Sequence, residues 1–293
     1  MMLEGHTGKI TCIAMLPDGR IISGSDDETL RVWDAASGAC ERVLEGHTDW
    51  IKCLAVLPDG RIVSGSRDVT LRVWDVASGA CERVLEGHTH NISCIAVLPD
   101  GRVVSGSIDK TLRVWDVASG TCERVLEGQP DFITFIAVLP DGRIVDGRIV
   151  SGSEDMTLRL WDVASGTCEH VLEGHRWHAT RITVLPLGRF VSESDMRHDK
   201  SLRIWDAASG TCERVVQSSD SDYVTMCADI ARYHSGSLLY HSGARIHMGE
   251  DLNCSMRTPE TTPETASATV RLFGFGVNGQ FFSVSVIPGS ASS

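Results

Sequence analysis

A unit of 41 residues that repeats almost verbatim constrains this chain more than any other feature, since the string Leu-Glu-Gly-His begins at Leu3, Leu44 and Leu85. The dipeptide Trp-Asp recurs with it, and its tryptophans are Trp33, Trp74, Trp115, Trp161 and Trp205. Self-similarity at a fixed period predicts stacked units that bury a continuous core between neighbours. Repeat architectures of this kind mostly present surface for binding.

One repeat carries the signals of four short strands. Apolar and β-branched segments at 10–16, 20–25, 29–33 and 39–44 are separated by turn residues, among them Pro17-Asp18-Gly19 and Ser37-Gly38. Strand signals divided by such turns predict an antiparallel four-stranded meander. We therefore expect an all-β chain.

Each repeat also contains a Ser and an Asp six residues before the Trp, and all but the fourth have an upstream His. In the first repeat these are His6, Ser23, Asp27 and Trp33. A buried carboxylate needs hydrogen bonds and a buried indole N–H needs an acceptor, so a Ser–His–Asp–Trp chain satisfies its own members. A Ser–His–Asp set also suggests a hydrolase triad. Because the set recurs in every unit with its serine inside a strand, we interpret it as structural.

These residues resemble the WD-repeat β-propeller family, in which they form a hydrogen-bonded tetrad in each four-stranded blade. The resemblance covers roughly residues 3–217 and implies these tetrads: His6, Ser23, Asp27 and Trp33; His47, Ser64, Asp68 and Trp74; His88, Ser105, Asp109 and Trp115; Gln129, Ser151, Asp155 and Trp161; His175, Ser192, Asp199 and Trp205. In the fourth unit Gln129 replaces His and Pro130 follows it. An amide donates and accepts, so we expect a weaker network there.

The resemblance implies a single β-propeller over residues 1–293. The clear repeats span 3–44, 45–85, 86–126, 127–172 and 173–217, and 218–293 holds degenerate blades with a linker near 257–268. Closing the disc removes exposed sheet edges. We expect seven blades, with six as the alternative, the last one or two being degenerate.

Charge and cysteine placement narrow the class of partner. The formal net charge is −12, and no basic tract is present, which argues against nucleic acid. Eight of the 10 cysteines recur at repeat positions, and no Cys-x-x-Cys spacing is present, which argues against zinc. No apolar run spans a membrane and the first residues resemble no signal peptide. We expect an intracellular, cytoplasmic protein, with the nucleus as an alternative, without metal or cofactor.

Near-identical repeats differ mainly at two places: the start of the first strand and the end of the second. In a meander these lie at one end of the sheet, so the differing residues share one face of the disc. We call this set the variable face: Lys9, Asp26, Trp50, Lys52, Arg67, Asn91, Ile108, Phe132, Glu154, His178 and His198. Exposed aromatics and arginine are enriched in binding hot spots, although exposed turns also drift freely.

The function that follows is a non-enzymatic scaffold, monomeric or part of a larger complex, that binds proteins or peptides through the variable face. A second hypothesis is a substrate-recognition subunit of a ubiquitin ligase. Against it, alanine follows Trp-Asp by two residues in every repeat, where the family's adaptor-docking pattern has arginine. The remaining hypotheses are a fragment of a larger repeat protein and a propeller enzyme.

Overall fold

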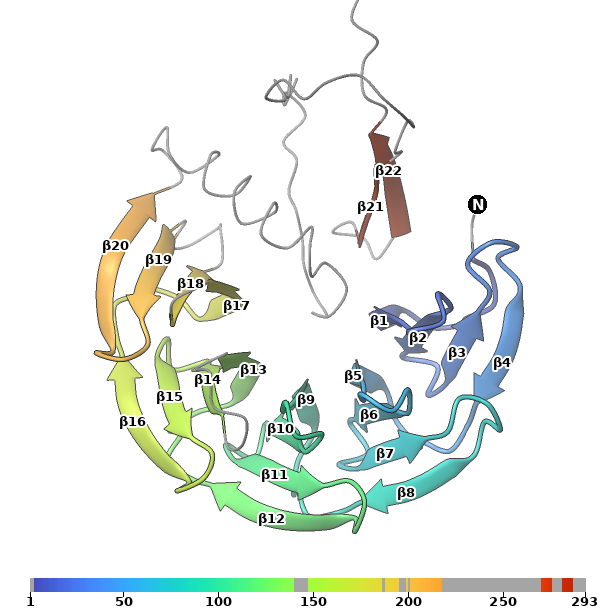
Figure 1. Cartoon of the computed structure of the whole chain (residues 1–293), viewed down its shortest axis with the longest axis horizontal. Helices are drawn as coiled ribbons and strands as arrows, with labels where there is room; N and C mark the ends of the chain where they lie inside the picture. Colours follow the sequence, from blue (N-terminus) through green and yellow to red (C-terminus); the bar gives the residue numbers. More distant parts are fainter. Residues whose placement is uncertain are drawn as a thin grey trace, which may run out of the picture. The chain divides into compact units, whose positions relative to one another are not determined.

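The computed structural model describes residues 3–139, 147–185, 188–194, 199 and 201–217, and the backbone of two strands between residues 270 and 286. The chain divides into two compact units, residues 1–242 and 243–293. In the described part of the first unit, five antiparallel sheets of four strands follow one another (Figure 1). None of the described residues forms a helix with the length and apolarity needed to cross a lipid bilayer.

In each sheet the four strands are neighbours in the order in which they occur along the chain. The first two sheets consist of β1 (Ile10–Met15), β2 (Ile21–Ser25), β3 (Leu30–Trp33) and β4 (Cys40–Leu44), then β5 (Ile51–Val56), β6 (Ile62–Ser66), β7 (Leu71–Trp74) and β8 (Cys81–Leu85). The third consists of β9 (Ile92–Val97), β10 (Val103–Ser107), β11 (Leu112–Asp116) and β12 (Thr121–Leu126). The last two consist of β13 (Ile133–Leu139), β14 (Arg148–Ser153), β15 (Leu158–Asp162) and β16 (Thr167–Leu172), then β17 (Ala179–Leu185), β18 (Arg189–Ser194), β19 (Ser201–Asp206) and β20 (Thr211–Gln217). This confirms the expected all-β blades.

Short turns with fixed chemistry produce the meander. In the first sheet the strands lie within one residue of the ranges expected from the sequence. Between β1 and β2, Pro17 presets the turn, the Gly19 N–H donates to the Leu16 carbonyl at 2.9 Å, and Gly19 adopts a φ of 88°. The same bond recurs at Gly60 and Gly101, so the repeated Leu-Pro-Asp-Gly string sets the register of this hairpin in the first three sheets.

Consecutive sheets pack flank against flank. The first strands contact one another in succession, β1 with β5, β5 with β9, β9 with β13 and β13 with β17. In Figure 1 these strands lie on the inner side of the row of sheets, and the fourth strands lie on its outer side. One core cluster joins Val32 of the first sheet to Ile62 and Trp74 of the second. Trp74, Trp115, Trp161 and Trp205 each lie in a core cluster shared with the preceding sheet, so each fills the junction between two sheets.

A glycine on the second strand permits this close approach. Gly65 lies across the sheet from Cys53, and a Cβ at Gly65 would come within 2.7 Å of an Ile92 methyl group on the next sheet. The corresponding cross-strand pair in the fifth sheet is Glu193 and Arg181. The face of the fifth sheet that points away from the fourth sheet thus carries charged side chains at these two positions, where the preceding sheets carry small or apolar ones.

The second unit contains one described hairpin, β21 (Val270–Phe275) paired antiparallel with β22 (Phe281–Val286). These strands lie within 218–293, where the sequence predicts degenerate blades. The expected linker near 257–268 lies outside the described residues. A blade count beyond five stays a prediction, as do the domain boundaries.

A strained backbone position recurs directly after the tetrad aspartate, where Glu28, Val69, Lys110 and Met156 all have φ between 65° and 71°. This left-handed region disfavours β-branched residues most, and Asn tolerates it best among residues with a side chain. We expect Val69→Asn to raise the free energy of unfolding by about 1 kcal/mol in urea denaturation. Val69→Thr keeps the β-branch and should bring no gain; an equal gain from both variants would contradict the strain argument.

Candidate functional site

The tetrad side chains form one hydrogen-bonded chain in each complete repeat. In the second repeat, Trp74 Nε1 donates to Ser64 Oγ at 2.8 Å, and Ser64 Oγ lies 2.7 Å from His47 Nε2. His47 Nδ1 lies 2.6 Å from Asp68 Oδ2. The first, third and fifth repeats have the same bonds, within 2.6–2.8 Å. The network ties the start of each repeat to the turn between its second and third strands.

A neutral imidazole can satisfy all of these contacts. Its Nδ1–H then donates to the carboxylate and its Nε2 accepts from the serine hydroxyl. Ser64 and Ser105 are fully buried, and each hydroxyl is already engaged by an indole and an imidazole. A substrate could reach such a serine only if the sheet opened.

The fourth repeat lacks two of the donors that the other aspartates receive. Elsewhere the aspartate Oδ2 accepts from the imidazole and from the backbone N–H after it, as Asp68 does from Thr48 at 3.1 Å. In the fourth repeat these positions hold Gln129 and Pro130, and proline has no N–H. Gln129 Nε2 donates to Ser151 Oγ at 2.5 Å, but Gln129 Oε1 and Asp155 Oδ2 are buried without a partner. The tetrad here is incomplete.

The pKa values in the tetrads make the fold sensitive to acid. Burial lowers the pKa of His6 and of His175 below the ordinary 6.5, against the opposing effect of their aspartate partners. Burial alone would raise the pKa of Asp27, but hydrogen bonds from Thr29, His6 and the Thr7 N–H outweigh it and hold that pKa well below its usual range. The folded state therefore keeps these imidazoles neutral and this carboxylate charged at pH values where the unfolded chain takes up protons.

We expect the free energy of unfolding to fall as pH drops through about 6.5, because the unfolded histidines bind protons there and the folded ones do not. Asp27 adds a further loss below the usual carboxyl range. Urea denaturation between about pH 7 and pH 5 measures the slope. A His6→Gln, His175→Gln double variant should be less stable but show a shallower slope; an unchanged slope would contradict the assignment.

The residues of the variable face lie together at one end of the sheets. Within a sheet, the carbonyl of the residue before the first strand accepts the N–H of the residue before the tetrad aspartate. These pairs are Lys9 with Asp26 at 2.8 Å, Trp50 with Arg67 at 2.9 Å, Asn91 with Ile108 at 3.0 Å, and Phe132 with Glu154 at 3.0 Å. The described members of the variable face thus occupy equivalent places in successive sheets, while His198 lies outside the described residues.

Side chains of the variable face also link one sheet to the next. Lys52 Nζ lies 3.5 Å from Asp26 Oδ1 of the preceding sheet. His178 Nδ1 lies 3.2 Å from Glu154 Oε2 in the same relation. Between the third and fourth sheets, Lys110 Nζ donates to the Pro130 carbonyl at 2.8 Å and stands 5.9 Å from the Phe132 ring centroid. The face is therefore a connected surface across all five sheets.

The densest contacts on this surface surround Trp50. Its side chain is exposed, and the Arg67 guanidinium carbon and Lys52 Nζ stand 4.4 Å and 4.8 Å from its ring centroid. In the amide orientation that satisfies both groups, Asn91 Oδ1 accepts from Arg67 Nε and Nδ2 donates to the Arg67 carbonyl, each at 3.2 Å. Residues of two sheets thus hold one cation against one aromatic ring.

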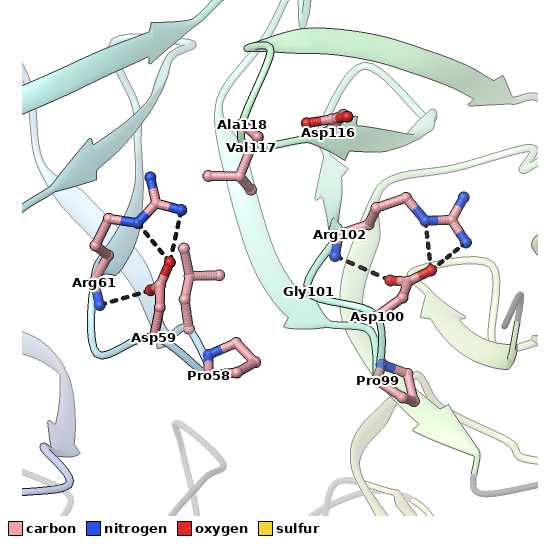
Figure 2. Close-up of a pocket in the computed structure, with 11 residues that line it drawn as sticks. Pro58, Asp59, Arg61, Pro99, Asp100, Gly101, Arg102, Asp116, Val117 and Ala118 are labelled. Carbon is pink, nitrogen blue, oxygen red and sulfur yellow. Dashed lines mark hydrogen bonds and ion pairs between the residues drawn. The ribbon is translucent and has the colours of Figure 1, made fainter. Parts of the chain in front are cut away.

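A different surface lies at the opposite end of the sheets. A pocket of about 400 Å³ opens between the second and third sheets, lined by the turns that contain Pro58, Pro99 and Val117 (Figure 2). Its arginines are already paired, since Arg61 Nη2 and Arg102 Nη2 each lie 2.7 Å from the aspartate two residues earlier. Each also meets a glutamate of the fourth strand at 3.2 Å. This pocket offers no unpaired charge from either arginine.

Metal-ligating side chains do not gather in the part of the chain that the structure describes. Among those residues, no three His, Cys, Asp or Glu side chains come together in an arrangement that could hold a metal ion.

Repeated four-stranded blades with a Ser–His–Asp–Trp network define the class of protein as a WD-repeat β-propeller fold. The family model described as "WD domain, G-beta repeat" matches residues 1–34, 38–75, 79–116, 120–162 and 166–206. The chain belongs to the WD40-repeat family. Members of this family are generally non-enzymatic scaffolds for protein interaction.

Curated relatives are similar over about one repeat. The chain is 43% identical over 44 residues (15% of this chain, 6% of the relative) to the ribosome biogenesis protein BOP1 homolog of Monosiga brevicollis. It is 51% identical over 37 residues (12% and 3%) to the vegetative incompatibility protein HET-E-1 of Podospora anserina. It is 43% identical over 42 residues (14% and 10%) to WD repeat-containing protein 18 of Homo sapiens. These matches span a tenth or less of each relative.

Lys110 also differs between repeats, directly after a tetrad aspartate, and the structure places it against Pro130 and Phe132 of the next sheet. The pairing of side chains between sheets, such as Lys52 with Asp26, was not foreseen, because no periodic pattern shows which neighbour a surface charge meets.

Proposed function

We propose that this chain is a non-enzymatic scaffold that binds another protein, or a peptide segment of one, through the variable face. The observation that carries the proposal is the contrast within the repeats. In the first three repeats the buried residues and the turns at the opposite end hardly change, while the residues that differ gather on one surface. Trp50 and Phe132 stand there 40% and 42% exposed. Large exposed aromatics beside cations are the groups that anchor protein interfaces.

A paired affinity capture with a matched control tests the proposal. The wild-type chain is compared with a variable-face variant, Trp50→Ala, Arg67→Glu and Phe132→Ala. The control is an outer-strand variant, Val84→Ala, Arg83→Glu and Val125→Ala, which makes the same change in charge and alters valines that are 40% and 37% exposed. All three baits are first checked for the same circular dichroism and melting temperature.

We expect one or more proteins to be recovered with the wild type and the outer-strand variant, and to drop at least about tenfold with the variable-face variant, because hot-spot residues carry most of the binding energy. Equal recovery with all three baits would contradict the proposal. Loss only with the outer-strand variant would place binding on the outer strands instead.

A further inference from the structure

Arg67 is the one feature of the variable face whose geometry points to a ligand chemistry. Its guanidinium stacks 4.4 Å from the Trp50 ring centroid, and its Nε is engaged by Asn91 of the next sheet at 3.2 Å. Stacking covers one face of the guanidinium, and the hydrogen bond to the Asn91 side-chain amide fixes the rotation of the guanidinium group. A side chain that is normally mobile is thus oriented before any partner arrives, which reduces the entropy lost on binding.

Among the residues that the structure describes, the outer edge of this guanidinium has no anionic partner: Arg67 forms no ion pair with them, and neither of its Nη groups receives a hydrogen-bond partner from them. The contrast with Arg61 and Arg102 is clear, since each of those meets two carboxylates. Lys52 adds a second positive charge at the same ring, and its contact with Asp26 Oδ1, at 3.5 Å, is long. The nearby Asp49 carboxylate accepts the Trp50 N–H at 2.7 Å.

We propose that Trp50, Lys52 and Arg67 form a subsite for the carboxylate of an aspartate or glutamate side chain in a peptide segment of a partner protein. This inference rests on the proposed function, whose surface it shares. The two Nη groups of Arg67 match the two carboxylate oxygens in a bidentate pair, and Lys52 supplies the second charge. The exposed ring of Trp50 packs against the methylene groups of the acidic side chain.

The charge of the whole chain sharpens this assignment. With a formal net charge of −12, the protein repels acidic partners at long range, so an acidic residue binds only where local cations outweigh that field. Arg67 and Lys52 bring two cations to one ring at the junction of the first, second and third sheets, and Arg67 is the one of the two without a carboxylate partner among the described residues. A phosphorylated side chain shares the anionic oxygens, and the experiment separates the two sources.

Peptide selection on the full chain tests the subsite. A random peptide library displayed on phage is selected against the wild-type protein, and enriched peptides are synthesised with each acidic residue as it is or changed to its amide. Dissociation constants are measured for the wild type, Arg67→Ala, Arg67→Lys, Phe132→Ala and the outer-strand variant. Arg67→Lys keeps the charge but removes the planar fork. All variants are checked for unchanged melting.

We expect a recurrent acidic residue whose change to the amide weakens binding by about tenfold on the wild type and has no effect on Arg67→Ala. Arg67→Lys should behave more like Arg67→Ala than like the wild type. Peptides that depend on Phe132 but show no coupling between Arg67 and an acidic residue would overturn the subsite and leave the proposed function standing. Phosphoserine in place of the acidic residue, binding tenfold more tightly, would overturn the carboxylate assignment. No enrichment, or peptides insensitive to every variable-face change, would count against the proposed function itself.

Discussion

Replacing Trp74 with alanine is expected to lower the free energy of unfolding by about 4 kcal/mol, which is a large share of the stability of an ordinary domain. Trp74 is 1% exposed and packs in the core cluster that joins the first and second sheets. The change removes this contact, leaves a cavity and takes a hydrogen-bond donor from Ser64 Oγ. Because stacked repeats depend on their neighbours, the first sheet should loosen along with the second.

Trp50→Ala is the matched control, because it deletes the same atoms from a side chain that is 40% exposed. Its loss should stay within about 1 kcal/mol, the size of a surface cation–π contact. Urea denaturation followed by far-ultraviolet circular dichroism measures both variants. Equal losses would mean that the tetrad tryptophans do not carry the junctions between sheets.

Completing the fourth tetrad is expected to stabilise the protein. Gln129→His should raise the free energy of unfolding by about 2 kcal/mol, because Asp155 Oδ2 and the Gln129 amide oxygen are buried without partners. Adding Pro130→Thr gives Asp155 a backbone N–H donor, equivalent to the one that Asp68 receives from Thr48. This second change should raise the free energy of unfolding by about 1 kcal/mol more. Urea midpoints at constant slope give both increments.

The reverse change in a complete repeat provides the control. His88→Gln gives the third tetrad the side chain of the fourth and removes the imidazole bond to Asp109 Oδ2, which is 2.7 Å long. It should destabilise the protein by about the amount that Gln129→His gains. If Gln129→His leaves the free energy of unfolding unchanged while His88→Gln lowers it, Asp155 has another hydrogen-bond donor in the fourth repeat, and the incomplete tetrad does not destabilise the protein.

The sequence predicted the blades well because their determinants are local and repeated. The Pro-Asp-Gly turn and the alternation of apolar and polar residues in segments such as 29–33 act over a few residues. A strand that is unclear in one repeat can be assigned from the same position in the next. The tetrad bonds could be anticipated because Asp27 and Trp33 keep a constant spacing that places both near His6. The variable face was derived from differences between repeats, and the described members lie at equivalent places.

Other features depend on contacts that no local pattern encodes. The stacking of Arg67 on Trp50 and its bond to Asn91 join two sheets, so they follow from how neighbouring blades meet. Predicting that Asp155 Oδ2 is buried without a partner requires knowing that Pro130 occupies the position of a backbone N–H donor in the other repeats. The left-handed conformation of Val69 conflicts with the preference of its side chain and is imposed by the turn. After residue 217 the sequence no longer follows the repeat, so strands there cannot be assigned by comparison with the earlier repeats.

Hydrogen exchange of the full chain, with and without a partner recovered by the affinity capture, tests most directly whether the variable face is the binding surface. We expect the partner to slow exchange in the segments before and within the first strands, 7–10, 48–52, 89–93 and 131–134, and to leave the turns at 17–20, 58–61 and 99–102 unchanged. Protection confined to those turns, or to the outer strands, would contradict this expectation.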